Sequence, residues 1–407
     1  MICRQCQQPF TVFPDETELH QSFGLPAPTL CPVCRLQGRL AFRNERSLYN
    51  RTCDLCHQPI VSIHKGTAPY PVYCQPCWWS DQYDAMASGQ PFDFSKTFTE
   101  QFKQLQLAVP HAALYQTNAT NSTYNNYVLN ISDCYLLFGG GNNEHCLYGK
   151  YIIDCKDVLD VYSSIQNELG YELVGSDHCY NCRYADFSRN CRDCAFIAEC
   201  LACSDCIMCY GLQHKQYYYQ NKYVGPEKFA VLKDQYDHLT AAGWENAVQE
   251  FKDFRKTFPQ RASHIYASED CTGDLISNSV DCHECFDIKE SEHCRYVSYI
   301  PLAKDSVDCT FGAPYGVEHC YNLCSATGNK NCHNAFLIWN SYDVAYSTEC
   351  HLSHDLFGCA GLRKQQYCIL NKQYNPAEYQ ALKEKIITHM TTTGEWGEYL
   401  SPEYVTL

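Results

Sequence analysis

The sequence predicts a mainly β protein with some helix. Two small N-terminal zinc ribbons precede a duplicated, cysteine-rich parallel β-solenoid, and each copy of the solenoid is closed by an amphipathic helix. The first observation behind this prediction is a tandem repeat, because Cys209–Lys233 and Cys359–Lys383 lie 150 residues apart and share ten of 25 positions. The second is the spacing of the 30 cysteines, which changes between the first 95 residues and the rest of the 407-residue chain.

Length, hydropathy and charge limit the number of domains, the cellular compartment and the kinds of partner that we expect. A chain of 407 residues is expected to form more than one domain. Met1 leads directly into a polar, cysteine-bearing segment without a secretory signal pattern, and no apolar run is long enough to span a bilayer. We therefore expect a cytoplasmic protein with no membrane partner, in which cysteines bind metal or pack as small apolar groups. The net charge of −15 falls on residues 116–407, which disfavours the repeats as a surface for nucleic acid.

Eight cysteines near the N-terminus form four Cys-x-x-Cys pairs. The pairs are Cys3/Cys6, Cys31/Cys34, Cys53/Cys56 and Cys74/Cys77. A two-residue spacer lets one tight turn supply two thiolates, and two such turns complete a tetrahedral zinc site. A unit of about 45 residues is too small to fold on its apolar core alone, so metal binding would supply much of its folding free energy. The spacing predicts two Zn²⁺ ions per chain. A crossed arrangement, in which the first and third pairs share a metal, stays open.

Further residues around these pairs carry a resemblance to known proteins. In the first unit they are Cys3-Arg-Gln-Cys6, Phe10, Glu16 or Glu18, Pro28 and Cys31-Pro-Val-Cys34-Arg35, on which the unit resembles a bacterial family of probable zinc-ribbon domains. Elsewhere they are Arg43-Asn-Glu-Arg46, Pro71-Val-Tyr-Cys74, Cys77-Trp-Trp-Ser-Asp81, Asp93-Phe-Ser95 and the Asn-Lys motifs of the repeats. On these the chain is similar to a set of candidate-phyla bacterial proteins that combine zinc ribbons with cysteine-rich repeats. The resemblance brings no enzymatic activity with it.

Five arginines follow the first ribbon and form a candidate polyanion-binding row. They are Arg35, Arg39, Arg43, Arg46 and Arg51. The first four are spaced by four, four and three residues, which predicts that they lie along one side of a helix. Beside a zinc ribbon, such a row could grip phosphates. The alternative is a solvated helix face, or arginines that pair with the acidic repeats of the same chain.

The remaining segments fall into a linker and two repeat copies. Apolar residues spaced by four, three and four predict an amphipathic helix over Thr97–Val109, and the polar run Thr117–Tyr127 reads as an exposed loop or linker. Pro226 and Pro376 each begin a helical pattern that we expect to cap or flank a solenoid. The predicted domains are 1–51 (ribbon 1 with the arginine helix), 52–95 (ribbon 2), 96–131 (helix and linker), 132–224 (solenoid copy 1), 225–267 (capping helices), 268–374 (solenoid copy 2) and 375–407 (capping helix and tail).

Repeat cysteines recur every nine to 12 residues, which predicts short strands in a parallel β-solenoid with about two such steps per coil. Cysteine suits an inward-facing position of such a solenoid, and Ser341 takes its place at one such position of the second copy. The alternative is a metal loop at Cys200, Cys203, Cys206 and Cys209. The second copy has Cys350, Ser353, Leu356 and Cys359 there, which excludes a ligand set common to both copies and favours core packing. A metal site unique to the first copy stays open.

No phosphate-binding loop, nucleophile elbow or His-Glu-x-x-His motif is present in the sequence. The first functional hypothesis is therefore a non-enzymatic zinc-binding scaffold that contacts a macromolecular partner. A second is nucleic-acid or ribonucleoprotein binding through the ribbons and the arginine row. A third is an enzyme with a carboxylate site on the solenoid. Its candidate residues are the copy-shared Asp157/Asp305, Asp160/Asp308 and Glu168/Glu318, and turn capping is the alternative role for them.

Overall fold

The computed structural model describes residues 1–312, 316–327, 329–330 and 332–398, and it is mainly β with some helix. The chain divides into two compact units. Unit 1 comprises residues 1–44, 49–113 and 262–407, and unit 2 comprises residues 45–48 and 114–261. The paired N-terminal cysteines and the second repeat copy therefore share unit 1, whereas the first copy makes up most of unit 2. Residues 399–407 of the predicted tail lie outside the described residues.

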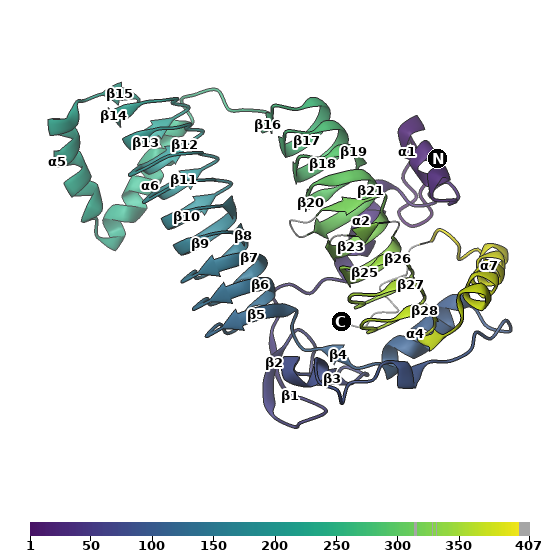
Figure 1. The fold of residues 1–407 in the computed structure, drawn as a ribbon. Helices are drawn as coiled ribbons and strands as arrows, with labels where there is room; N and C mark the ends of the chain where they lie inside the picture. The colour runs from purple at the N-terminus through teal and green to yellow at the C-terminus, as the bar shows by residue number, and fades with distance from the viewer. Residues whose placement is uncertain (313–315, 328, 331, 399–407) are drawn as a thin grey trace. The chain divides into compact units, whose positions relative to one another are not determined.

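Unit 2 is built on a pile of short parallel strands, here called the first stack (Figure 1). Residues 12 apart in the sequence lie side by side in this stack. The Asn142 side-chain amide donates to Asp154 Oδ1, and the backbone of Glu168 is in register with that of Lys156. The parallel strands are β5 (Gln116–Thr120), β6 (Asn126–Ser132), β7 (Phe138–Glu144), β8 (Lys150–Ile153), β9 (Lys156–Ile165), β10 (Glu168–Val174), β11 (Arg183–Asp186), β12 (Ala195–Ala198), β13 (Ser204–Tyr210) and β14 (Gln216–Tyr219). The antiparallel strand β15 (Lys222–Tyr223) ends the sheet.

Unit 1 contains the second stack, which has the same design. Its parallel strands are β16 (Ile265–Tyr266), β17 (Glu269–Ser277), β18 (Val280–Lys289), β19 (Glu292–Arg295), β20 (Ser298–Pro301), β21 (Ala303–Gly312), β22 (Val317–Glu318), β23 (Tyr321–Thr327), β24 (Asn329–Lys330), β25 (His333–Trp339), β26 (Tyr342–Ala345), β27 (His354–Phe357) and β28 (Gln366–Ile369). Antiparallel β29 (Lys372–Gln373) follows. One coil is longer than the others, because Ala303 pairs with Val317 and the N–H of Cys320 donates to Ser306 Oγ, 14 residues earlier. This insertion explains why the offset between equivalent positions of the two copies increases by two after this coil.

Both stacks repeat a three-residue conformation. From Asn118 to Gln220 every third residue has a positive φ, and the same holds from Asn278 to Phe311. Asn, Asp and Gly adopt this left-handed conformation at the least cost, which accounts for their abundance in the repeats. The residue after each such position points inward, and four triplets complete one coil, which brings Asn130 beside Asn142, 12 residues on. The sequence-based expectation of about two cysteine steps per coil is therefore wrong, because a single long step already completes a coil.

The inward residues form a buried core in which cysteine is the commonest residue. Cys191, Cys194, Cys200 and Cys203 are fully buried with Ile197 in the first stack. Each of these thiols has two backbone carbonyl oxygens within hydrogen-bonding distance, as Cys191 Sγ has Arg189 O at 3.4 Å and Cys200 O at 3.6 Å. Ser341 takes a cysteine's place, and its hydroxyl has the same two kinds of acceptor within reach, Trp339 O at 3.0 Å and Cys350 O at 3.5 Å. Cysteine and serine are interchangeable here because both are small and satisfy the same carbonyls.

Helices flank each stack, as the prolines predicted. In unit 2, α5 (Pro226–Asp237) contacts β14, and α6 (Ala241–Arg255) packs on β12 and β13. Phe229 and Phe251 are buried there against Phe196 and Met208. In unit 1, α7 (Pro376–Thr393) contacts β28 and ends at Gly394, whose φ of 75° glycine adopts without strain.

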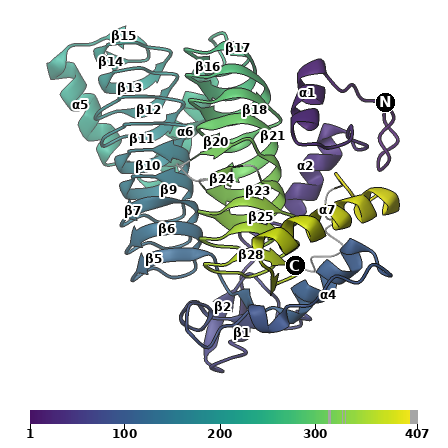
Figure 2. The ribbon, with the colours of Figure 1, turned by 45° about the vertical axis from the view of Figure 1, so that its right-hand side comes forward.

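The N-terminal modules of unit 1 lie against the second stack (Figure 2). Their helices are α1 (Pro14–Ser22), α2 (Pro32–Ala41), α3 (Gln75–Trp78), the 3-10 helix η1 (Met86–Ser88) and α4 (Phe98–Ala108). Their strands are β1 (Tyr49–Thr52), β2 (Pro59–Ser62), β3 (Val72–Tyr73) and β4 (His111–Ala112). Helix α4 begins with a Thr97–Glu100 capping box and buries Phe98, Phe102 and Leu105, as its apolar spacing predicted.

Three further sequence-based expectations need correction. The polar run Thr117–Tyr127 is no linker, because it contributes to β5 and β6, where asparagines occupy the left-handed positions. The boundary between ribbons at residues 51 and 52 cuts through β1, which pairs with β2 in the second module. The arginine row does not lie on one helix, because α2 ends at Ala41, before Arg43, Arg46 and Arg51.

Candidate metal centres

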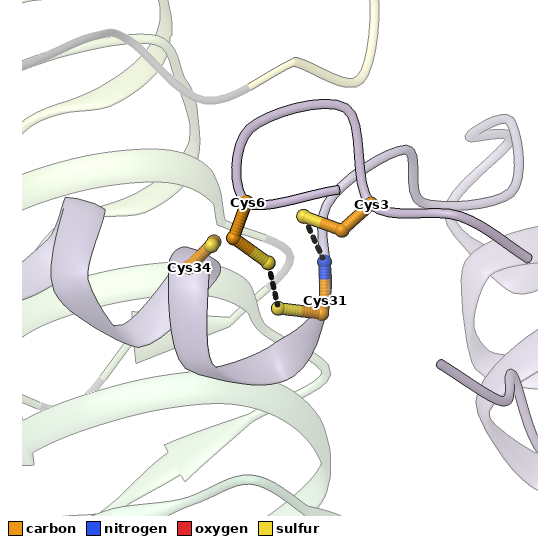
Figure 3. A group of neighbouring side chains, drawn as sticks. All are labelled: Cys3, Cys6, Cys31 and Cys34. Carbon is orange, nitrogen blue, oxygen red and sulfur yellow. Dashed lines mark hydrogen bonds between the residues drawn. The ribbon is translucent and has the colours of Figure 1, made fainter. Parts of the chain in front are cut away.

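The first candidate centre is formed by Cys3, Cys6, Cys31 and Cys34. Their four Sγ atoms all lie within 4.8 Å of one another (Figure 3). Cys6 Sγ is 3.7 Å from Cys31 Sγ, and the backbone N–H of Cys31 donates to Cys3 Sγ at 3.3 Å. We call this group tetrad 1.

Local backbone geometry explains how the two pairs of tetrad 1 converge. An antiparallel bridge between Ile2 and Pro9 closes the turn that carries Cys3 and Cys6, and Gln7 takes a positive φ of 60° in it. Cys31 is the N-cap of α2, and the following proline occupies the first helical turn, where its missing N–H is not needed. The first pair therefore comes from a tight turn and the second from a helix start.

Tetrad 2 repeats this arrangement with Cys53, Cys56, Cys74 and Cys77. Its Sγ atoms also lie within 4.8 Å of one another. The backbone N–H of Cys74 donates to Cys53 Sγ at 3.3 Å, and Cys74 is the N-cap of α3. His57 has a φ of 58°, matching Gln7 of tetrad 1. In both tetrads, two Cys-x-x-Cys pairs that follow each other in the sequence come together. The crossed arrangement, in which the first and third pairs share a site, does not occur.

In each tetrad, one cysteine is predisposed to ionise. Burial raises the pKa of Cys3, but hydrogen bonds from the backbone N–H groups of Cys6 and Cys31 outweigh it and lower that pKa to about 6. The same balance in tetrad 2 lowers the pKa of Cys53 to about 7. Burial and the neighbouring thiols raise the pKa of Cys34 to about 12. A cation that replaces the protons would relieve this crowding, because thiolates are the form that binds metal.

The donor sets fit a metal ion that prefers four sulfur ligands in a tetrahedron. The protein itself supplies four ligands in each tetrad, which leaves no open position for a substrate or a water molecule. Such closed sites stabilise folds and do not catalyse reactions. Both tetrads could therefore hold structural metal ions.

The stack cysteines are arranged differently. Among the described residues, the groups with metal-compatible spacing are the two tetrads and Asp270 with Asp281 and His283. Cys200, Cys203, Cys206 and Cys209 do not form such a group, and each of their thiols donates to backbone carbonyls. None of the 30 cysteines, all of which lie in the described ranges, forms a disulfide. The structure thus separates the eight N-terminal cysteines from the others.

Sequence reasoning missed the group of Asp270, Asp281 and His283. The group is partly exposed, and Asp281 already pairs with His283 at 3.1 Å and with His293 at 2.9 Å. These residues lie on the first coils of the second stack. The signal that could have found them is the coil period, which brings Asp281 beside His293 on the next coil.

The candidate polyanion-binding row is dispersed, and its first two members are buried. Arg35 Nε lies 2.7 Å and Arg39 Nη1 2.8 Å from opposite carboxylate oxygens of Asp308 in β21. Arg35 also pairs with buried Glu16 at 2.7 Å. Phosphate could not reach these two guanidinium groups. The hypothesis that this row grips phosphate is therefore wrong for Arg35 and Arg39, and the alternative of pairing with the acidic repeats holds for these two.

The other three arginines each have a different environment. Arg43 lies over the ring of Phe311 at 3.9 Å, and its guanidinium donates to Ser325 Oγ. Within unit 2, Arg46 lies 5.4 Å from the ring centroid of Phe138. Arg51 pairs with Asp54 at 2.7 Å beside tetrad 2.

The copy-shared carboxylates do not share one environment. Asp308 is fully buried under the two arginines, whereas its counterpart Asp160 is exposed. Asp157 lies 3.1 Å from His145 on the neighbouring coil, and Glu318 pairs with Lys330 one coil on. Such pairs between neighbouring coils are consistent with a stabilising role at the corners of the stacks.

Comparisons with known proteins leave the family open. No family model matches the chain, and no curated protein does. The zinc-ribbon resemblance therefore rests on the cysteine motifs. A solved structure described as a putative acetyltransferase from Desulfovibrio desulfuricans G20 is 13% identical over 66% of this chain and 71% of that chain, with a TM-score of 0.12, too low to carry an argument. No helix in the described part of the chain has the length and apolar character needed to cross a membrane.

Proposed function

We propose that this protein is a non-enzymatic, cytoplasmic scaffold that binds two structural zinc ions and presents its stacks to a macromolecular partner. The observation that carries the proposal is the pair of closed four-cysteine sites. Zinc fits them because it takes four thiolates in a tetrahedron and is redox-inert. Free thiols throughout the chain are typical of a reducing compartment.

The zinc sites support a role in positioning. Helix α2 begins at Cys31 and carries Arg35 and Arg39 onto Asp308, so zinc at tetrad 1 would fix the helix that neutralises a buried carboxylate of the second stack. Helix α3 begins at Cys74 and places Trp78 5.3 Å from the guanidinium of Arg363 in the same stack. Each zinc ion would thus hold an N-terminal module on the second stack.

We further propose that both stacks are parallel β-solenoids. The regular strand register, the inward residue in every triplet and the flanking helices support this. A solenoid is rigid because each coil bonds to the next, and its long faces suit the binding of extended partners. The buried thiols and hydroxyls are saturated by backbone carbonyls, which fits a structural interior better than a catalytic one.

Metal analysis of the purified full-length chain tests the zinc assignment. We expect about two zinc ions per chain by inductively coupled plasma mass spectrometry. The double variant Cys31→Ser/Cys34→Ser should retain one. The matched control Cys200→Ser/Cys203→Ser removes two stack cysteines and should retain both. Loss of zinc in the control would count against the assignment.

Affinity purification of the full chain, with and without nuclease, tests the scaffold role. A protein partner that co-purifies in both cases supports it. Co-purification that depends on intact nucleic acid would favour the ribonucleoprotein alternative instead.

A further inference from the structure

The two stacks carry the same face, which is buried on the second stack and partly exposed on the first. On the second stack this face comprises Tyr296, Val307, Asp308, Thr310 and Tyr321, which are all buried. The register places Val307 between Arg295 and Tyr321, and Thr310 beside Ser298. The cover is formed by α1 and α2 of unit 1.

Two arginines one helical turn apart hold the cover in place. Arg35 and Arg39 reach opposite oxygens of Asp308, and Arg39 Nε donates to Thr310 Oγ1 at 3.1 Å. The Arg35 guanidinium also lies 5.2 Å from the ring centroid of Tyr296. Charge-assisted hydrogen bonds together with a cation–π contact make a specific receptor for arginine. Phe23 and Leu25 fill the apolar remainder of the face.

The first stack keeps the two residues that receive the arginines. Tyr148 stands where the second stack has Tyr296, and Asp160 stands at the same offset from Asp308. The same pairing pattern holds, since Leu147, Leu159 and Tyr171 are neighbours on successive coils. Here, however, Tyr148 is 50% exposed and Asp160 is exposed.

Around these two residues the first-stack face is apolar and acidic. Leu147, Tyr162 and Val174 are more than one-third exposed. Tyr162 lies on the same strand as Asp160, and Leu147 and Val174 lie on the two neighbouring coils. Glu172 replaces the neutral Asn322 of the second stack, which adds a negative charge one coil from Asp160. A cluster of exposed apolar side chains around acidic groups is typical of a protein-binding site, and its negative charge favours a positively charged partner.

The edges of this face are already occupied within unit 2. Glu45 pairs with Lys150 at 2.9 Å, and Trp244 of α6 lies against Tyr171 with ring centroids 5.2 Å apart. Tyr148, Asp160 and Tyr162 lie between these two contacts.

We infer that this face of the first stack binds a partner protein through a helix that carries two arginines one turn apart, as α2 binds the second stack. The arginines pair with Asp160 and Glu172 and stack on Tyr148, and apolar residues of the helix cover Leu147 and Tyr162. The inference rests on the proposed scaffold role and names the partner's chemistry.

An unbiased selection tests the inference. A library of random helical peptides displayed on phage is selected on immobilised full-length protein, and the affinities of enriched peptides are measured by fluorescence anisotropy. We expect enriched helices to carry arginines three or four positions apart. Asp160→Lys should weaken their binding at least about tenfold, equivalent to about 1.4 kcal/mol, and Tyr148→Ala should also weaken it. Both residues are exposed, so the variants should fold, which circular dichroism verifies.

The control is Asp234→Lys on α5, which replaces another exposed carboxylate, whose side chain is 79% exposed. It should change affinity less than about twofold, as most surface substitutions do. No enrichment, helices without paired arginines, or equal binding to the Asp160→Lys variant would overturn the inference. Self-association of the chain that Asp160→Lys abolishes would assign the face to a second copy and overturn it as well. Zinc content measured on the same preparation reports on the proposed function separately, because the peptide assay needs no metal signal.

Discussion

Asp160 and Asp308 occupy the same place in the two stacks, yet one is exposed and the other is completely buried between Arg35 and Arg39. The two stacks thus present two versions of one surface. In unit 1 the acidic position holds an N-terminal module in place, and in unit 2 it remains open to solvent.

Removing the buried carboxylate should destabilise unit 1. Asp308→Asn leaves the buried guanidinium of Arg39 without its carboxylate partner and that of Arg35 with Glu16 alone, and breaking such a buried pair typically costs about 3–5 kcal/mol. Asp160→Asn removes the equivalent exposed carboxylate and should change stability by less than about 0.5 kcal/mol. Urea unfolding followed by hydrogen exchange of each unit measures both. Equal effects of the two substitutions would contradict the role of the buried ion pair.

Removing the metal should loosen the N-terminal modules of unit 1 and leave unit 2 unchanged. A zinc chelator would release the start of α2 at Cys31 and therefore the contact of its arginines with β21. Hydrogen exchange of Ala303–Gly312 should become faster after chelation, whereas Ala195–Ala198 of unit 2 should keep its protection. Unchanged exchange in Ala303–Gly312 would show that the metal does not support this contact.

An inward cysteine should tolerate serine and resist leucine. Ser341 is the second-stack counterpart of Cys191 and makes the same two hydrogen bonds. Cys191→Ser should therefore cost at most about 1 kcal/mol, the size of one net hydrogen bond. Cys191→Leu overpacks the coil and should cost about 1–3 kcal/mol. Thermal denaturation of unit 2 compares them, and a serine variant less stable than the leucine variant would refute the packing account.

The buried His111–Glu349 pair should make unit 1 sensitive to pH. Burial by itself lowers the pKa of His111, but Glu349 Oε1 at 2.5 Å outweighs it and raises that pKa above its ordinary value. A histidine whose pKa rises on folding stabilises the fold fully below its unfolded pKa of about 6.5. That contribution is lost as the pH rises through the higher folded pKa.

The groups facing His111 from other elements are His64 and Tyr70. Burial lowers the pKa of His64 to about 3 and raises the pKa of Tyr70, so both stay neutral in this range. The urea midpoint of zinc-loaded unit 1 should therefore fall from about pH 6 to about pH 9 in the wild type, and Glu349→Gln should flatten this fall. The same slope in both proteins would rule out the pair as its source.

The three-residue repeat of the stacks is present in the sequence, but the distance between successive cysteines does not reveal it. Cysteines such as Cys191 and Cys200 are three triplets apart, and a coil has four triplets, so the cysteine grid and the coil length differ. A more direct signal is the residue before each inward cysteine, which is often Asp, Asn or His, as in Asp133, Asn190 and His145. These residues tolerate the left-handed conformation that the structure requires there.

The tetrads were predictable because ligand spacing is local. Two residues separate the cysteines of each pair, and the turns that this spacing demands form without reference to the rest of the chain. The burial of Arg35 and Arg39 against Asp308 was not predictable. Asp308 lies far along the chain from both, and only the packing of α2 on β21 brings it near. A charge row on a helix looks the same in sequence whether it faces water or a buried partner.

The metal content of the full-length protein distinguishes metal-binding cysteines from packed ones. We assign zinc to the eight cysteines of the two tetrads and packing to the eleven cysteines of each stack. We therefore expect about two zinc ions and no iron per chain after expression in medium containing both metals. About four or more metal ions, or any stoichiometric iron, would contradict this assignment.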